Sequence, residues 1–121
     1  MLNKCFLTGR PTNNPVDHEG EKGRFVTFSL AVNGRKNKDG TNETMFIDCV
    51  LSNEKQCSIF MEYIKKGSLI TVVGRLYQNR YTDRNGLQHS KTSLSVEEFE
   101  MFSTPDNQDP VKEKVEDGLP F

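Results

Sequence analysis

One amphipathic helix pattern stands in the middle of a chain whose other apolar residues alternate as in β-strands. The spacing i, i+3, i+4, i+7 of a single buried helix face is followed by Cys57, Phe60, Met61 and Ile64. Ser52 or Asn53 can cap the start of this helix. Lys65 and Lys66 are expected in its last turn, where they favour the negative end of the helix dipole, and Gly67 is expected to stop it.

The segments around this helix are predicted to be strands. Residues 2–8, 24–32, 44–51, 68–81 and 89–102 have the apolar alternation or the composition of strands. The two central strands before the helix have one apolar face each, formed by Val26, Phe28, Leu30 and Val32 and by Met45, Ile47, Cys49 and Leu51. The linking segments are predicted to be a polar loop at 11–23 and hairpin turns at Asp39-Gly40 and 83–86.

The order of these elements is strand, strand, strand, helix, strand, strand. This is the order of the oligonucleotide/oligosaccharide-binding (OB) fold, an all-β barrel of five strands with its helix between the third and fourth. A ferredoxin-like fold needs two helices, and an immunoglobulin sandwich has no central helix. The sequence therefore predicts a five-stranded OB barrel over residues 1–102.

The last 19 residues differ from the rest in composition and charge. The net charge of −1 is the sum of +2 over residues 1–102 and −3 over residues 103–121. Residues 103–110 contain two prolines and no apolar side chain, so little burial offsets the entropy of ordering them. We therefore expect a mildly basic domain followed by a disordered acidic tail.

Several function classes find no support in the sequence. No apolar run approaches the roughly 18 residues of a membrane span, and the polar start does not resemble a signal peptide. The odd set of Cys5, Cys49 and Cys57 fits reduced, buried thiols in a cytosolic protein better than a disulfide framework. His18 and His89 have no Cys or Glu at metal-ligand spacing, and no catalytic motif occurs. We expect no enzyme activity, no metal and no cofactor.

The predicted strand at 68–81 contains the most informative pattern. One of its faces carries Arg75, Tyr77, Asn79 and Tyr81. Such alternation suits a single-stranded nucleic acid, because arginine binds phosphate and a flat ring stacks on a base. An ordinary solvated strand explains the pattern equally well, since Tyr and Arg are common there, and both interpretations stay open.

Phe46 lies opposite the apolar face of the strand at 44–51, so it belongs either to a second core or to an exposed platform. Basic side chains flank the candidate strands at both predicted hairpins. Charge runs are usually solvated surface, but two basic hairpins beside outward aromatic side chains favour nucleic-acid binding. The basic residues concerned are Arg35, Lys36, Lys38, Arg80, Arg84 and Lys91.

The chain ends in Leu119-Pro120-Phe121, which is unusual for a disordered tail. A partner pocket could hold the Phe121 ring while a basic residue pairs with the terminal carboxylate, and Pro120 would lower the cost of ordering. Chance is the alternative explanation for so short a segment.

Five segments resemble the bacterial and phage single-stranded DNA-binding protein family. Asn3–Arg10 resembles the family's opening strand, and Phe28–Asn33 its second strand. Tyr63–Leu69 is similar to the end of its helix and Val73–Leu76 to the strand that follows. Leu119–Phe121 matches its C-terminal tip. These segments occur in the same order and at similar spacing as in the family. The resemblance therefore covers residues 2–102 and the last few residues.

The resemblance implies a homotetramer that binds and protects single-stranded DNA without sequence specificity in replication, recombination and repair. It implies a location in the bacterial cytoplasm, for a chromosomal or a phage- or plasmid-encoded protein. It also implies that the C-terminal tip recruits proteins of these processes through Asp117, Leu119, Pro120 and Phe121.

Individual positions of this sequence can be placed on the family pattern. Phe46 and Tyr81 fall on stacking positions, and Tyr77 and Asn79 fall on positions that are often basic. Lys55 and Lys66 fall near basic contact positions around the helix. The chain has no tryptophan, on which the family often stacks bases.

Two other functions are kept as alternatives. One is an OB-fold RNA-binding protein or a primosome-type accessory protein, although the Leu119–Phe121 ending argues against the primosome type. The other is a nuclease or metal-dependent hydrolase, which the absence of a carboxylate or His/Cys cluster disfavours.

Overall fold

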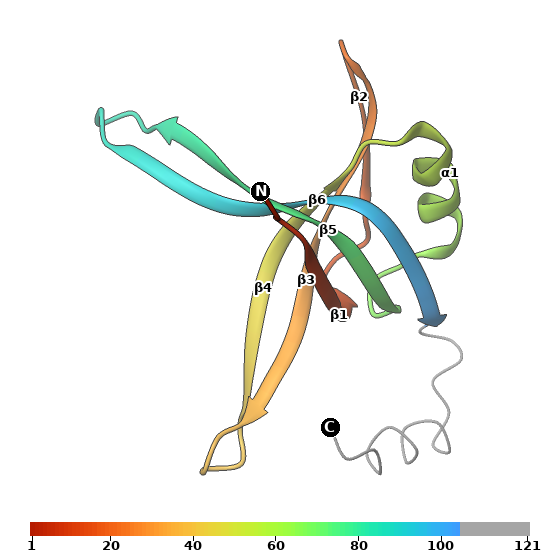
Figure 1. The fold of residues 1–121 in the computed structure, drawn as a ribbon, viewed down its shortest axis with the longest axis vertical. Coiled ribbons are helices and arrows are strands. Elements are labelled where there is room, and N and C mark those ends of the chain that lie inside the picture. The colour runs from red at the N-terminus through yellow and green to blue at the C-terminus, as the bar shows by residue number, and fades with distance from the viewer. Residues whose placement is uncertain (105–121) are drawn as a thin grey trace.

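The computed structural model describes residues 1–104, which form a six-stranded sheet with one helix at its side (Figure 1). The elements are β1 (Cys5–Pro11), β2 (Val16–Gly20), β3 (Gly23–Lys36), β4 (Asn42–Leu51), α1 (Glu54–Tyr63), β5 (Leu69–Thr82) and β6 (Gln88–Ser103). Ser103, which was predicted to begin the disordered tail, is instead the buried last residue of β6. From residue 105 on, the predicted acidic tail lies outside the described residues.

The sheet closes into a barrel because β1 pairs with two strands. Its residues Cys5–Gly9 pair antiparallel with β5, and Arg10 and Pro11 pair antiparallel with β3. The sheet order is β1-β5-β6-β4-β3-β2, and the β4–β6 pairing is parallel. Without β2, five strands close the barrel and the helix lies between the third and the fourth of them. The predicted OB fold is therefore confirmed.

The first strand is shifted from the prediction by three residues at each end. Gly9, Arg10 and Pro11 were expected to end it, but they remain extended where β1 passes from β5 to β3. A Cβ atom at Gly9 would collide with the carbonyl oxygen of Ala31, so glycine permits the close crossing. Pro11 has no N–H for the ladder, and its carbonyl accepts a hydrogen bond from the Gly67 N–H at 3.0 Å.

The prediction of a loop at 11–23 is wrong for β2, which forms a hairpin with β3. This strand is polar, so it has no apolar alternation to reveal it. Its position is fixed by Arg24, whose guanidinium donates to both carboxylate oxygens of Asp17 at 2.8–3.1 Å and to the Ser58 hydroxyl of α1 at 2.7 Å. The hydrogen bond from Arg24 also lowers the pKa of Asp17.

The core lies inside the barrel and under α1. The predicted inward faces of the two central strands are confirmed by the burial of Val26, Phe28, Leu30, Ile47, Cys49 and Leu51. Phe60 of α1 stacks on the Phe28 ring at 4.6 Å and meets the Phe99 ring edge-on at 4.9 Å. Met45 is the exception, because it lies where the β3–β4 hairpin leaves the barrel and is 47% exposed.

The start and the buried face of α1 agree with the prediction. The Asn53 side chain caps the helix by accepting a hydrogen bond from the Gln56 N–H at 3.1 Å. Cys57 and Phe60 are fully buried.

The end of the helix differs from the prediction. α1 ends at Tyr63, so Lys65 and Lys66 lie beyond its last turn. The buried Ile64 is already extended at the C-cap position, because the chain turns there to bring this side chain into the core. Gly67 has a φ of +86° and lies in the turn that leads to β5.

The three cysteines are free thiols, as expected. Cys49 and Cys57 are buried and Cys5 is half-buried. Burial raises the pKa of Cys49 to about 12, which keeps this thiol neutral and unreactive.

Two hairpins project from the barrel in different directions (Figure 1). We call residues 33–44 the β3–β4 arm and residues 77–93 the β5–β6 arm. Their turns lie where they were predicted, with Gly40 at a φ of +91° and Gly86 at +80°. Within residues 1–104, no helix has the length and apolarity needed to cross a membrane.

Candidate nucleic-acid interface

The alternating side chains of β5 form one row together with their partners on β6. Directly opposite residues of an antiparallel pair point to the same side of a sheet. The pairs are Arg75 with Ser95, Tyr77 with Ser93, Asn79 with Lys91, and Tyr81 with His89. The row predicted for this strand therefore exists, and it runs from the barrel wall out along the β5–β6 arm.

The row continues onto β4, which pairs with β6. Asp48 lies beside Ser93 in the parallel ladder, and its carboxylate forms an ion pair with the Lys91 ammonium. The hydrogen bond to Asp48 raises the pKa of Lys91. This contact fixes the base of the β5–β6 arm against β4. We call the combined surface of β4, β6 and β5 the outer face.

Phe46 lies on the outer face and belongs to no second core. It is 64% exposed and pairs with Ala31 of β3, two residues from Asp48 along β4. Of the two roles left open by the sequence, the structure therefore selects the exposed platform. Tyr81 is 54% exposed, whereas Tyr77 is half-buried where the arm joins the barrel.

A hollow of about 490 Å³ lies on the outer face next to Tyr77. The Asn3 side chain closes one side, because its amide donates to the Leu76 carbonyl at 2.8 Å and accepts from the Leu76 N–H at 3.0 Å. The hollow thus combines an aromatic ring, a guanidinium and an amide, which suits a base and its phosphate. Its lining consists of Asn3, Val50, Arg75, Leu76, Tyr77 and Ser95.

The tip of the β5–β6 arm holds Tyr81 in a fixed arrangement. The His89 ring stacks on the Tyr81 ring, with centroids 5.2 Å apart and planes inclined by 21°. Nε2 of His89 lies 2.6 Å from Oδ2 of Asp83. The other carboxylate oxygen of Asp83 accepts the N–H groups of Asn85 and Leu87, each at 2.9 Å. The hydrogen bond with His89 is the main cause that lowers the pKa of Asp83.

The arginines of this arm are placed differently from its tyrosines. Arg80 stands between Asn79 and Tyr81 on the strand, so it lies on the opposite side of the hairpin. Arg84 lies in the turn. Both are exposed, and neither forms an ion pair with another residue of the described chain.

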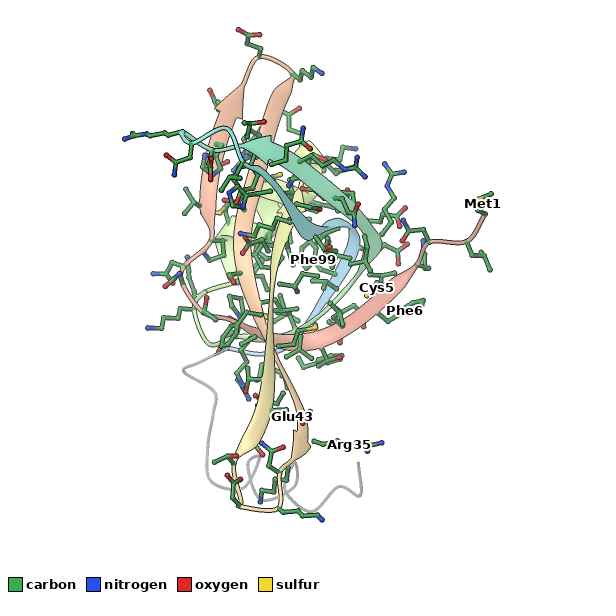
Figure 2. The ribbon with its side chains drawn as sticks, turned by 90° about the vertical axis from the view of Figure 1, so that its left-hand side faces the viewer. Met1, Cys5, Phe6, Arg35, Glu43 and Phe99 are labelled. Carbon is green, nitrogen blue, oxygen red and sulfur yellow. The ribbon has the colours of Figure 1, made fainter. Side chains whose placement is uncertain are left out.

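The β3–β4 arm presents its predicted cations at its end. Arg35, Lys36 and Lys38 are exposed and form no ion pair within residues 1–104. Figure 2 shows the Arg35 side chain reaching outward from this arm. The Asp39 carboxylate closes the turn by accepting from the N–H of Thr41 at 3.0 Å and from its hydroxyl at 2.6 Å, which lowers the pKa of Asp39.

The structure does not bring Lys55 and Lys66 to the outer face. Lys55 belongs to α1 and Lys66 follows it, on the side of the barrel away from the tip of the β5–β6 arm (Figure 1). The predicted partner-binding residues Asp117, Leu119, Pro120 and Phe121 lie outside the described residues.

Sequence reasoning missed His89 and the Asp48–Lys91 pair. The signal for His89 was present, because a turn at 83–86 with regular pairing on both sides places Tyr81 opposite His89. The Asp48–Lys91 pair joins strands that are 43 residues apart, and pattern alone does not pair them. Residues 1–104 contain no group of three or more His, Cys, Asp or Glu side chains that could hold a metal ion.

The closed barrel and its outer face define a class of protein. This topology with exposed aromatic and cationic side chains is that of OB-fold proteins that bind single-stranded nucleic acids. A family model described as the single-strand binding protein family matches residues 2–102. The chain belongs to this family.

Relatives and solved structures agree with this assignment. Single-stranded DNA-binding protein 1 of Lactococcus lactis is 33% identical over 106 residues, covering 86% of this chain and 70% of that protein. The single-stranded DNA-binding protein of Bacillus cereus is 38% identical over 109 residues, covering 88% of this chain and 63% of that protein. A structure of a Plasmodium falciparum SSB complex with ssDNA superimposes with a TM-score of 0.76 at 21% identity, covering 85% of this chain and 97% of that chain, which shows the shared fold.

Proposed function

We propose that this protein binds and protects single-stranded DNA without sequence preference. The observation that carries the proposal is the outer face, on which the rings of Phe46, Tyr77 and Tyr81 and the Arg75 guanidinium follow one path from β4 to the β5–β6 arm. Phe46, Tyr77 and Tyr81 stack on bases. Phosphates are bound by Arg35, Lys36, Lys38, Arg75, Arg80 and Arg84, and Lys55 and Lys66 extend the path around the barrel.

Stacking supplies more of the affinity than charge does. Residues 1–102 have a net charge of only +2, so the general attraction for a polyanion is weak. Each base stacked on an aromatic side chain contributes about 1–3 kcal/mol. Because every base has a π-face, this mode of binding is insensitive to sequence.

The test is a fluorescence anisotropy titration of labelled oligo-dT, oligo-U and a duplex of equal length at 50 and 200 mM salt. We expect oligo-dT to bind much more tightly than the duplex, since paired bases cannot reach the rings. Tighter binding of oligo-U would establish the alternative, an RNA-binding or primosome-type OB protein. Equal binding of the duplex would refute the stacking model.

We also propose that the protein assembles as a homotetramer. Residues Cys5–Gly9 of β1 pair with β5 on one side, and no other strand within residues 1–104 pairs with their second edge. Phe6 stands on this strand with 69% of its surface exposed. An open strand edge and an exposed aromatic side chain together favour pairing with another copy.

Light scattering during size-exclusion chromatography tests the assembly. We expect four times the chain mass for the unmodified protein and a smaller mass for Phe6→Lys. Phe102→Lys, which alters another exposed aromatic residue, is the matched control. A monomer in the unmodified protein would exclude the tetramer.

The C-terminal tip is proposed to recruit proteins of DNA replication, recombination and repair in the bacterial cytoplasm. Support comes from the segment Asp117-Gly118-Leu119-Pro120-Phe121, in which acidic and apolar side chains combine within a few residues. Phe121 is the anchor in this proposal.

A pull-down with the immobilised protein from bacterial extract, read out by mass spectrometry, tests the tip. We expect deletion of 117–121 or Phe121→Ala to abolish capture of replication and repair proteins, whereas Val115→Ala retains it. DNA binding should stay equal or become tighter after the deletion, because acidic charge is removed. Loss of DNA binding would contradict this model.

A further inference from the structure

His89 is one of the two histidines of the chain, and its surroundings differ from those of His18. Its ring is 5.2 Å from Tyr81, a proposed stacking residue, and its Nε2 atom is 2.6 Å from the Asp83 carboxylate. His18 stacks on Phe25 at 4.7 Å and bonds to the Thr27 hydroxyl at 2.9 Å, in the β2–β3 hairpin. His89 therefore belongs to the outer face, and His18 does not.

The hydrogen bond with Asp83 determines which nitrogen of His89 carries a proton. The pKa of Asp83 is lowered, so near neutral pH its carboxylate is ionised and can only accept hydrogen bonds. Nε2 of His89 is thus the donor. Nδ1 has no hydrogen-bond partner among residues 1–104 and is the atom that gains a proton when the ring becomes charged.

The groups that face this ring tolerate a positive charge. Tyr81 of β5 offers its π-face and Asp83 of the turn offers its carboxylate. Lys91 lies two residues along β6 on the same side, but its charge is compensated by Asp48 of β4. Arg80 alternates with Tyr81 along β5 and so points to the opposite side of the strand, but it also lines the hollow beside His89.

We infer that His89 is a DNA-binding residue whose protonated ring donates its Nδ1–H to a phosphate of the strand that stacks on Tyr81. The inference rests on the proposed function. A hollow of about 540 Å³ at this place is lined by Arg80, Tyr81 and Thr82 of β5 and by Gln88, His89 and Ser90 of β6. The proton comes from solvent and forms the Nδ1–H bond, and the DNA itself undergoes no covalent change, so DNA binding takes up a proton. His89 also packs against one side of the Tyr81 ring.

Binding should therefore tighten as the pH falls. Histidine is the side chain whose ordinary pKa lies between pH 5 and 8, whereas carboxylates stay ionised down to about pH 5. One added phosphate contact steepens the salt dependence of single-strand binding by about 0.7. At 0.1 M salt this corresponds to about fivefold tighter binding at pH 5.5 than at pH 7.5.

The experiment measures oligo-dT affinity of the full chain and of His89→Gln and His18→Gln, at pH 7.5 and 5.5 and at two salt concentrations. Gln at position 89 keeps an N–H donor for Asp83 but cannot become charged. We expect the fivefold pH effect and the steeper salt slope in the unmodified chain and in His18→Gln, and neither in His89→Gln.

The outcomes separate the inference from the proposed function. Absence of oligo-dT binding by the unmodified chain at both pH values would refute the proposed function. Binding with the same pH effect in His89→Gln, or loss of the effect in His18→Gln, would overturn the inference alone.

Proton NMR of the unmodified chain gives a readout that needs no variant. At pH 6.5 the ring signal of His89 should move toward its charged-form position when oligo-dT is added, and an unmoved signal would also overturn the inference.

Discussion

The two arms are built alike but present different chemistry. Each is an antiparallel hairpin whose turn contains an aspartate with hydrogen bonds to the turn and a glycine at positive φ. The β3–β4 arm ends in cations, with Phe46 just beyond its base. The β5–β6 arm carries Tyr77, Tyr81 and His89 along one face. In the proposed complex, one arm therefore supplies charge and the other supplies rings.

The two arms also differ in the contacts that join them to the barrel. A lysine or arginine has a long, flexible side chain that can reach a phosphate in several conformations. An aromatic ring stacks on a base only when the ring plane is held in the right orientation. The β5–β6 arm is tied to its surroundings by the Asp48–Lys91 pair and by the two Asn3–Leu76 hydrogen bonds. In the β3–β4 arm, the Asn33–Thr44 hydrogen bond joins only the two strands of the arm itself.

The largest effect is expected where the firmly held arm leaves the barrel. A Cβ atom at Gly74 would collide with the Ser95 backbone carbonyl, so Gly74→Ala must displace a strand. We expect a loss of about 3 kcal/mol in the free energy of unfolding. At Gly34, in the other arm, a Cβ atom would lie 3.4 Å from the Glu43 carbonyl oxygen, and the cost of Gly34→Ala should stay within about 0.5 kcal/mol. Urea unfolding of both variants measures the difference, and equal stabilities would contradict the comparison.

The next largest effect concerns the rings. Tyr81→Ala and Phe46→Ala should each weaken oligo-dT binding by about 2 kcal/mol, or roughly thirtyfold, through loss of one stacked base. The salt slope should stay unchanged, because no charge is removed. Anisotropy at two salt concentrations measures both quantities. Leu87→Ala, which truncates another exposed apolar side chain of this arm, is the control. Unchanged binding in both ring variants would show that the outer face is not the binding site.

Most of the barrel could be predicted from the sequence because its signals are local. The alternation at 24–32 and 44–51, the helix face with Cys57 and Phe60, and the turns at Gly40 and Gly86 each depend on neighbouring residues. β2 could not be predicted in this way, since it is polar and is fixed by an Arg24 contact that reaches Asp17 and the helix.

The candidate site was only partly predictable for the same reason. The row of Arg75, Tyr77 and Tyr81 follows from the period of one strand. The exposure of Phe46 depends on where the barrel ends, and the parallel contact of β4 with β6 depends on the closed topology. The C-cap at Ile64 was missed because tertiary burial, and not helix propensity, decides where α1 ends.

A smaller effect is expected from the cations of the β3–β4 arm. Lys36→Ala should weaken oligo-dT binding about fivefold at 0.1 M salt and lower the salt slope by about 0.7, because one phosphate contact is lost. The difference should disappear near 1 M salt. Lys22→Ala, in the turn between β2 and β3, is the control and should change neither quantity. A loss that persists at high salt would mean that Lys36 has a structural role or a non-ionic contact.

The smallest effect distinguishes the two turns by their response to acid. The pKa values of Asp83 and Asp39 are both lowered, by His89 and Thr41 respectively. A lowered pKa in the folded protein stabilises it above the ordinary aspartate pKa of about 3.9, and this contribution is lost as the pH falls through the folded value. The Tm of the unmodified chain should therefore fall between pH 5 and pH 2. Asp83→Asn should flatten this fall more than Asp39→Asn, because the Asp83 carboxylate is held by hydrogen bonds with three residues, His89, Leu87 and Asn85, and the Asp39 carboxylate mainly by Thr41. Glu21→Gln in the β2–β3 turn is the matched control, and an equal flattening in all three variants would show that neither turn carries a specific interaction.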